Sequence, residues 1–377
     1  MTDLILANAR IVNAEAEFLG GIAVTEGRIS EIWEGDNIPN GAHDLGQDFL
    51  LPGFVEIHTD NVEKHMVPRP GVVWPSPVAA ILAHDAQMVA AGVTTVYDAI
   101  AVGEYLDRNY RRALLKTVME AVTEASTLNL FRADHYVHLR CEIADDVAPE
   151  LFKPYAKDPV VRLISLMDHT PGQRQWRDLK SFKVYKNANM SDKEFEAYVA
   201  SRIASASKNS EVNRRQILDL WSDRGPVASH DDTTPEHVSE AVKDNIRISE
   251  FPTTMEAAEA AKAAGMRTVM GGPNVARGGS HSGNVSAIDL ADADLLDALS
   301  SDYAPISLVQ AAFKLNEIGV MTLPKAVATI SKNPAEMLGH LDRGEIAVGL
   351  RADLVRVRKI DAAAVVRGTW VRGVKVA

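Results

Sequence analysis

The sequence predicts an α/β protein in which a (β/α)8 barrel of the TIM type carries a small β-sandwich domain formed by both chain ends. Three observations lead to this fold. Both ends consist of short runs rich in Ile, Leu and Val that glycines interrupt. Between about residues 52 and 335, strand-like and helix-like segments alternate, and the strand candidates number eight, as such a barrel requires. We assign residues 1–52 and 340–377 to the small domain and residues 53–339 to the barrel.

The small domain is predicted from apolar runs that turn residues separate, such as Glu26 and Gly27 near the start and Gly349 near the end. We expect the strands of the two ends to pair with one another. The expected strands cover residues 4–12, 21–25, 28–33, 345–357 and 365–376.

The barrel is predicted from a repeated unit in which a helix stops at a glycine and a strand follows. Residues 77–91 have helical apolar spacing and end at Gly92, a left-handed cap, before the next strand. The Ala-rich helix 255–264 ends at Gly265 in the same way. Amphipathic stretches at 192–208 and 212–224 are interpreted as helices that pack on the barrel. The expected strands cover residues 54–58, 94–99, 130–142, 161–167, 227–230, 247–251, 267–270 and a short piece that ends near Asp302.

Composition excludes several classes of function. The formal net charge of −11 argues against broad attraction to nucleic acid or to anionic membranes. The single cysteine, Cys141, excludes an internal disulfide and a cysteine-built zinc site, so any metal must bind mainly to His and carboxylates. No apolar run approaches the roughly 18 to 20 residues of a membrane span. We expect a cytoplasmic protein with a small-molecule partner.

Polar residues that end the strand candidates could form a metal site, because the carboxyl ends of barrel strands carry the active site. His58 and Asp60 alternate on one strand face, and further His and carboxylates end at least three other strands. A single such His is more often structural, but the recurrence favours a borderline divalent ion such as zinc, manganese, nickel or iron. His43, His84, His237 and His340 lack partners in the sequence and are interpreted as structural or solvent-facing.

Several motifs resemble a known family. FLLPGFVEIHTD at residues 49–60 and GEIAVGLRADLV at residues 344–355 are similar to the amidohydrolase superfamily. TDNVEKH with PRPG (59–71), MDHTPGQ (167–173) and GGPNVARGGSHSGN (271–284) narrow the resemblance to the PhnM family, the α-D-ribose 1-methylphosphonate 5-triphosphate diphosphatases of the carbon–phosphorus lyase pathway. The resemblance implies hydrolysis of a ribosyl phosphonate triphosphate to the 5-phosphate and pyrophosphate.

The resemblance also implies roles for individual residues. One or two divalent ions are expected, with zinc favoured. Asp302 would contact the metal and act as general base. The superfamily pattern His-x-His is replaced here by His-Thr-Asp, the variant expected for the PhnM family, and Glu142 is the closest match to the superfamily's bridging ligand. The expected metal ligands are His58, Asp60, Glu142, His169, His230 and Asp302.

An anionic substrate of an acidic protein requires a local basic pocket. Lys and Arg residues follow the first and fourth strand-end motifs, and glycines around Arg277 would let backbone N–H groups approach an anion. The expected substrate-binding residues are Lys64, His65, Arg69, Arg140, Lys183, Lys186, Asn274, Arg277 and His281.

Two rival functions stay open. One is hydrolysis of a cyclic amide or another C–N bond, or deamination, because a fold does not determine function. A neutral amide would have no use for Arg277 or for the basic residues 64–69. The other rival is a non-catalytic barrel in an assembly, which a complete set of potential ligands disfavours. The oligomeric state, including a homo-oligomer, is left open.

Overall fold

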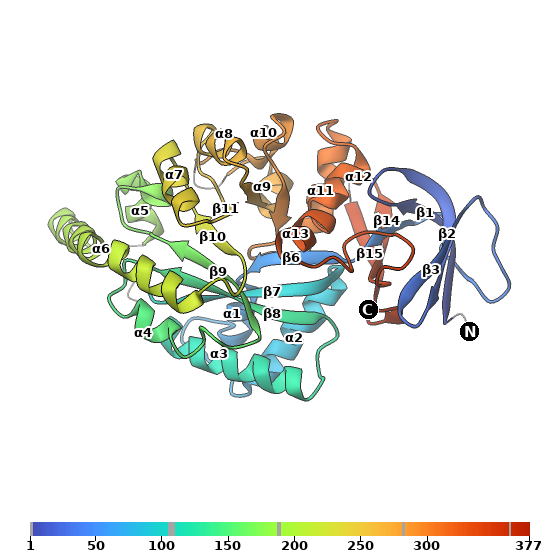
Figure 1. Cartoon of the computed structure of the whole chain (residues 1–377), viewed down its shortest axis with the longest axis horizontal. Helices are drawn as coiled ribbons and strands as arrows, with labels where there is room; N and C mark the ends of the chain where they lie inside the picture. Colours follow the sequence, from blue (N-terminus) through green and yellow to red (C-terminus); the bar gives the residue numbers. More distant parts are fainter. Residues whose placement is uncertain (1–2, 105–109, 187–189, 281–282, 362) are drawn as a thin grey trace.

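Both ends of the chain pair in one mixed sheet, as expected. The computed structural model describes residues 3–104, 110–186, 190–280, 283–361 and 363–377. Strand β5 pairs in parallel with β1 and antiparallel with β14, which joins the two ends inside the sheet. Figure 1 shows this sheet beside the barrel, with both termini on it. Its strands, in the order β16-β15-β14-β5-β1-β2-β3 with β4 beside β1, are β1 (Leu4–Val12), β2 (Glu17–Thr25), β3 (Arg28–Glu34), β4 (His43–Asp44), β5 (Phe49–Pro52), β14 (Leu354–Ile360), β15 (Ala363–Val371) and β16 (Val374–Lys375).

The second sheet is a parallel barrel whose strands neighbour one another in chain order, which confirms the predicted fold class. All eight predicted strands are present, although several begin or end a few residues from the predicted bounds. The assignment of domain boundaries stays a prediction. The barrel strands are β6 (Phe54–Thr59), β7 (Val93–Val102), β8 (Asp134–Glu142), β9 (Val161–Met167), β10 (Val227–His230), β11 (Ile248–Glu250), β12 (Arg267–Gly271) and β13 (Ala298–Ser300).

Helices surround the barrel (Figure 1). The predicted helix 77–91 corresponds to α2, whose N-cap Ser76 accepts a hydrogen bond from Ala79 and which ends before Gly92 at φ 92°. None of the described helices is both long and apolar enough to cross a membrane. The helices are α1 (Asn61–Met66), α2 (Pro77–Ala90), α3 (Tyr110–Thr127), α4 (Ala148–Phe152), α5 (Leu179–Tyr185), α6 (Asp192–Trp221), α7 (Pro235–Lys243), α8 (Met255–Ala263), α9 (Gly272–Arg277), α10 (Ala287–Asp292), α11 (Ser307–Glu317), α12 (Leu323–Ala328) and α13 (Lys332–Met337), with a 3-10 turn at Arg174–Trp176.

Several predicted elements differ from the structure. The predicted strand 365–376 is two strands, β15 and β16, which a turn at Arg372 and Gly373 separates. The stretches 192–208 and 212–224 form one continuous helix of 30 residues, α6, which a capping box between Ser191 and Glu194 begins. No glycine or proline lies between the two stretches to interrupt it. The predicted strand 345–357 was too long, since β14 begins at Leu354 and Gly349 before it adopts φ 90°.

Apolar side chains fill the barrel below its mouth. The layer takes residues from almost every strand, and all of them are buried. Tyr97 lies in this layer, and its hydroxyl is 3.0 Å from Nε2 of His340. The interior below the mouth is therefore a packed core, as is usual for such barrels. The layer includes Val55, Ile57, Tyr97, Leu163, Ala228, Ile248, Val269 and Ala298.

The barrel closes between its first and last strands through a few polar contacts. The backbone N–H of Asp302 donates to the carbonyl of His58 at 3.1 Å, and the N–H of Asp60 donates to the carbonyl of Asp302 at 3.0 Å. The buried carboxylate of Glu56 accepts hydrogen bonds from the N–H groups of His58 and Ser301, both at 2.8 Å. Burial raises the pKa of Glu56 to about 8 despite these bonds. These contacts place the ends of β6 and β13 side by side.

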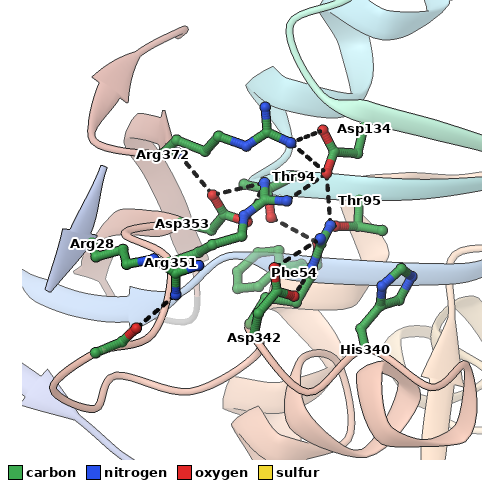
Figure 2. A network of polar contacts seen from close by, with 12 residues as sticks. Arg28, Phe54, Thr94, Thr95, Asp134, His340, Asp342, Arg351, Asp353 and Arg372 are labelled. Carbon is green, nitrogen blue, oxygen red and sulfur yellow. Dashed lines mark hydrogen bonds and ion pairs between the residues drawn. The ribbon is translucent and has the colours of Figure 1, made fainter. Parts of the chain in front are cut away.

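An ionic network fastens the small sheet to the opposite end of the barrel (Figure 2). Asp134 begins β8, and its carboxylate accepts hydrogen bonds from Arg343 at 2.7 Å and from Arg351 at 2.5 Å. Arg372 contacts it at 3.2 Å. Burial alone would raise the pKa of Asp134, but the nearby guanidinium groups hold it below its usual value. Asp353 balances Arg351 at 2.9 Å, so the charges in this buried region are paired.

We expect Asp134→Ala to lower the free energy of unfolding by about 3 kcal/mol, because the variant leaves two buried guanidinium groups without their shared carboxylate. Urea denaturation followed by tryptophan fluorescence would measure the change. Arg372→Ala is the matched control, since that side chain is 61% exposed and its loss should cost less than about 1 kcal/mol. Equal losses for the two variants would contradict the interpretation of Asp134 as the centre of the network.

Candidate active site

A cavity of about 330 Å³ lies at the carboxyl ends of the barrel strands. Its walls come from residues at the ends of β6, β8, β10 and β12 and from residues that follow β6, β9, β10, β11, β12 and β13, which are far apart in the sequence. Most of the residues expected from the sequence to bind metal or substrate line this cavity. They are His58, Asp60, Arg140, His169, His230, Asn274, Arg277 and Asp302.

A histidine and carboxylate cluster lies at one wall of the cavity. Nδ1 of His58 is 3.2 Å from Oε1 of Glu250, the last residue of β11, and Nδ1 of His138 is 3.8 Å from the same oxygen. All three side chains are buried. Burial, together with the positive charge of Arg140, lowers the pKa of His58, and burial lowers that of His138 to about 3, so both rings are neutral. Neutral imidazole is the form that binds metal.

Glu250 was missed as a candidate ligand, whereas His138 was noted among the polar residues that end the third strand candidate but was not included in the expected ligand set. Glu250 ends the sixth barrel strand, so the rule that selected the other strand-end residues would have identified it. His138 lies four residues before Glu142 inside β8 and on the same strand face. Glu56 was missed because it lies in the middle of the apolar run FVEIH, which was interpreted as core.

A second cluster surrounds His169. Nδ1 of His169 lies 2.6 Å from Glu142, whose carboxylate also accepts the backbone N–H of His169 at 3.1 Å. Nε2 of His169 is 3.6 Å from Asp231, and Nδ1 of His230 is 2.9 Å from the same carboxylate oxygen. Glu142 is not among the cavity-lining residues but orients His169, which is how carboxylates commonly support metal-binding histidines.

Unbonded buried atoms show that a divalent ion fits this site. Within the described residues, Nε2 of His138, Nε2 of His230, Oε2 of Glu250 and Oδ1 of Asp60 are buried and have no hydrogen-bond partner. Buried polar atoms are normally bonded, so this concentration requires an explanation. Ligand atoms of His58, His230 and Glu250 lie within 4.8 Å of one another, as do those of His169, His230 and Asp231. The two sets share His230.

A third group of potential ligands, His84, Asp98 and His135, is different because its atoms are already bonded. Nε2 of His84 and Nδ1 of His135 contact the two oxygens of Asp98 at 2.7 and 2.8 Å, and Nε2 of His135 lies 3.3 Å from Asp85. Burial would lower the pKa of His135, but the two carboxylates raise it to about 9. His135 is therefore the protonated member of this network, whereas burial lowers the pKa of His84. His84 has partners that the sequence interpretation did not give it.

Asp302 has the electrostatic environment of a proton acceptor near neutral pH. Burial raises its pKa to about 7, with a further contribution from the neighbouring carboxylate of Asp60. Its backbone has φ 54°, and Asp231 and Phe251, which follow β10 and β11, adopt φ 55° and 54°. Such conformations are unfavourable for residues other than glycine and concentrate at functional sites. All three residues line the cavity.

The predicted basic residues are divided between the cavity and the surface around it. Arg140 and Arg277 line the cavity, and Nη1 of Arg140 is 3.9 Å from Asp60. Lys64 donates to the carbonyl of Tyr303 at 2.5 Å, which places it at the rim. Arg69 is exposed and does not line the cavity.

Other predicted substrate-binding residues have different partners. His65 lies 2.9 Å from Gln87 on α2, Lys183 pairs with Asp192, and Lys186 lies over the ring of Tyr198. None of these three is among the residues that line the cavity. Asn274 lines it, but its side-chain oxygen accepts the N–H of Ala287 at 3.0 Å and so holds the loop. His281 lies outside the described residues.

Comparison with known proteins agrees with the family resemblance of the sequence motifs. Residues 49–376 match the amidohydrolase family. The chain is 41% identical over 378 residues to the α-D-ribose 1-methylphosphonate 5-triphosphate diphosphatase of Escherichia coli strain K12, and the match covers 99% of this chain and 100% of that protein.

Solved structures of similar shape share little sequence. N-acetylglucosamine-6-phosphate deacetylase from Pasteurella multocida has a TM-score of 0.65 at 14% identity, with 99% of each chain covered. The 5-methylcytosine deaminase from Klebsiella pneumoniae with 5-fluorocytosine has a TM-score of 0.66 at 16% identity, with 99% of this chain and 97% of that chain covered. At these identities the likeness establishes the fold.

We expect His58→Ala, His230→Ala and Glu250→Gln each to reduce the divalent metal bound by the purified protein, because each removes an atom of the unbonded cluster. Elemental analysis after dialysis against chelator and reloading would measure occupancy. His84→Gln is the control, since its network has no unbonded ligand atom and its loss should leave occupancy unchanged. Full occupancy in all three site variants would contradict a metal centre at the barrel mouth.

Proposed function

The chain belongs to the amidohydrolase family, and we propose on that premise that it hydrolyses α-D-ribose 1-methylphosphonate 5-triphosphate, or a closely related ribosyl phosphonate triphosphate. The products are the 5-phosphate and pyrophosphate. This places the enzyme in phosphonate catabolism, in the carbon–phosphorus lyase pathway. The full-length identity of 41% to the Escherichia coli diphosphatase supports the assignment.

The observation that carries the proposal is the composition of the cavity, which combines a histidine and carboxylate cluster with Arg140 and Arg277. In a protein of net charge −11, an anionic substrate needs such fixed positive partners. Arginine suits phosphate because its planar guanidinium donates two parallel hydrogen bonds. A neutral cyclic amide would leave both arginines without a function. A purely structural barrel would have no use for buried, unbonded ligand atoms.

Divalent metal would be held by His58, Asp60, His169, His230 and Asp302, with Glu250 added and Glu142 supporting His169. Two ligand sets that share His230 favour two ions over one. Imidazole and carboxylate ligands suit zinc, and also manganese, nickel and iron. When bound, the metal supplies Lewis acidity for phosphate charge and lowers the pKa of water.

The residues of the chain supply the rest of the chemistry. Asp302 accepts the proton of the attacking water, for which its pKa of about 7 is suited. Arg140 and Arg277 orient the phosphate chain and stabilise the charge that develops on its oxygens. Lys64 adds positive charge at the rim. We further propose a cytoplasmic location and a small-molecule substrate without a nucleic-acid partner.

Phosphorus NMR of the purified, metal-replete protein tests the function directly. We expect pyrophosphate and the ribosyl 5-phosphate to form from the triphosphate much faster than ATP or a cyclic amide is hydrolysed. Faster hydrolysis of the cyclic amide would favour the C–N hydrolase instead.

The variant Arg277→Ala sharpens this test. Loss of a hydrogen bond to a charged group should lower kcat/KM for the triphosphate by about 10- to 150-fold. A shortened, less charged analogue should lose less, because fewer phosphate contacts remain. Metal content should not change. Equal losses on both compounds would show that Arg277 does not recognise the phosphate chain.

Asp302→Asn separates catalysis from binding. A general base acts in the transition state, so kcat should fall by about 100-fold or more while KM changes little. Metal occupancy must be measured in the same sample, because Asp302 is also an expected ligand. A variant that retains metal and a near-native kcat would mean that another group accepts the proton.

A further inference from the structure

A short segment between β9 and α5 places one side chain in the cavity that the proposed mechanism does not use. Gln175 lines the cavity and is part of the 3-10 turn Arg174–Trp176. Its two neighbours have other partners: Arg174 contacts Asp232, and Trp176 packs against Phe182.

Arg174 anchors the turn on one side. Its guanidinium donates to the backbone carbonyl of His230 and to Oδ1 of Asp232, both at 2.9 Å. The side chain of Asp232 is completely buried, and it also accepts the hydroxyl of Ser249 at 3.0 Å. Arg174 has φ 47°, a backbone conformation that costs free energy and that these contacts maintain. Arg174 is thus committed to Asp232 and does not serve as a free cation for the substrate.

Trp176 anchors the turn on the other side. Its ring is buried and packs against Phe182 of α5, with the ring centroids 5.3 Å apart. Its carbonyl accepts the N–H of Gly172 at 2.9 Å, which closes the loop. The backbone of Gln175 is therefore held between two fixed neighbours, so little backbone entropy remains to be lost when its side chain contacts a ligand.

We propose that Gln175 is a substrate-contacting residue that donates its amide N–H groups to an anionic phosphate oxygen, and that Arg174 is the positioning residue that aims it. This inference rests on the proposed function. The amide provides two donors without positive charge. A further cation at this position would be attracted to the cavity carboxylates Asp231 and Asp302, as Arg174 is to Asp232. The uncharged amide is attracted less strongly to these carboxylates, so its N–H groups remain available to the substrate.

The test compares Gln175→Ala and Gln175→Glu with the same substitutions at Gln173. Gln173 lies on the same segment but is not among the cavity-lining residues. Glutamate retains the shape and the acceptor atoms of glutamine but removes the donors and adds a negative charge. We expect Gln175→Glu to lower kcat/KM for the triphosphate by about 10-fold or more, and more than Gln175→Ala does. Both Gln173 variants should stay within about twofold, and metal content should be unchanged throughout.

Arg174→Lys, alone and combined with Gln175→Ala, tests the positioning role. Lysine cannot hold the turn as a planar guanidinium does, so the single variant should resemble Gln175→Ala. If Arg174 acts through Gln175, the double variant is no worse than the more damaging single variant. Additive losses, or metal lost in proportion to activity, would show that Arg174 acts through His230 and would overturn this role.

Failure of the Gln175 contact can be distinguished from failure of the proposed function. Equal activity of Gln175→Glu and Gln173→Glu would overturn the contact between Gln175 and the phosphate. Wild-type protein that leaves the triphosphate intact would overturn the proposed function itself, and the inference with it, before any variant is compared.

Discussion

The closure of the barrel between β6 and β13 is the constraint on which the active site depends. Two backbone hydrogen bonds, Asp302 to His58 and Asp60 to Asp302, align the ends of the first and last strands. The same residues provide the expected ligands and the expected base. Glu56 adds a carboxylate that bonds the N–H groups of both segments. Any slip in this register would therefore separate His58 and Asp60 from Asp302, and the site would be lost together with the barrel.

Pairing of charges differs between the two ends of the barrel. At the amino-terminal end of the barrel strands, Asp134 and Asp353 form ion pairs with the guanidinium groups around them, although Nε of Arg351 and Oδ2 of Asp353 have no hydrogen-bond partner within the described residues. At the mouth, Glu250 and His138 bury atoms that have no hydrogen-bond partner within the described residues. The satisfied group around Asp98 shows that this protein can bury histidines and carboxylates with complete bonding. What distinguishes the mouth is that its unbonded atoms include those of His230 and Glu250, which offer ligand atoms within 4.8 Å of each other, and this convergence supports a metal site there.

Local sequence patterns predicted the barrel because several strands are short apolar runs and helices such as α2 and α8 end just before a glycine, Gly92 and Gly265. Strand ends then identified His58, His169, His230 and Asp302, since parallel strands bring their carboxyl ends together. The same reasoning failed for Lys183, because closeness in sequence to His169 does not determine where the helix after a loop points. Glu56 lies in the middle of the apolar run of β6, where only three-dimensional packing distinguishes a functional polar residue from a core residue.

The joining of both chain ends in one sheet has a consequence for biosynthesis. Arg358 donates a hydrogen bond to the carboxylate of Asp48, which lies 310 positions earlier in the sequence. Strand β5 likewise has β14 as its antiparallel partner. During translation, β1 to β5 therefore leave the ribosome long before that partner exists, with one edge of β5 unpaired. Exposed strand edges promote aggregation, and contacts between distant segments form slowly. The nascent chain is thus most vulnerable until its last residues are released, and a truncated product would retain this open edge permanently.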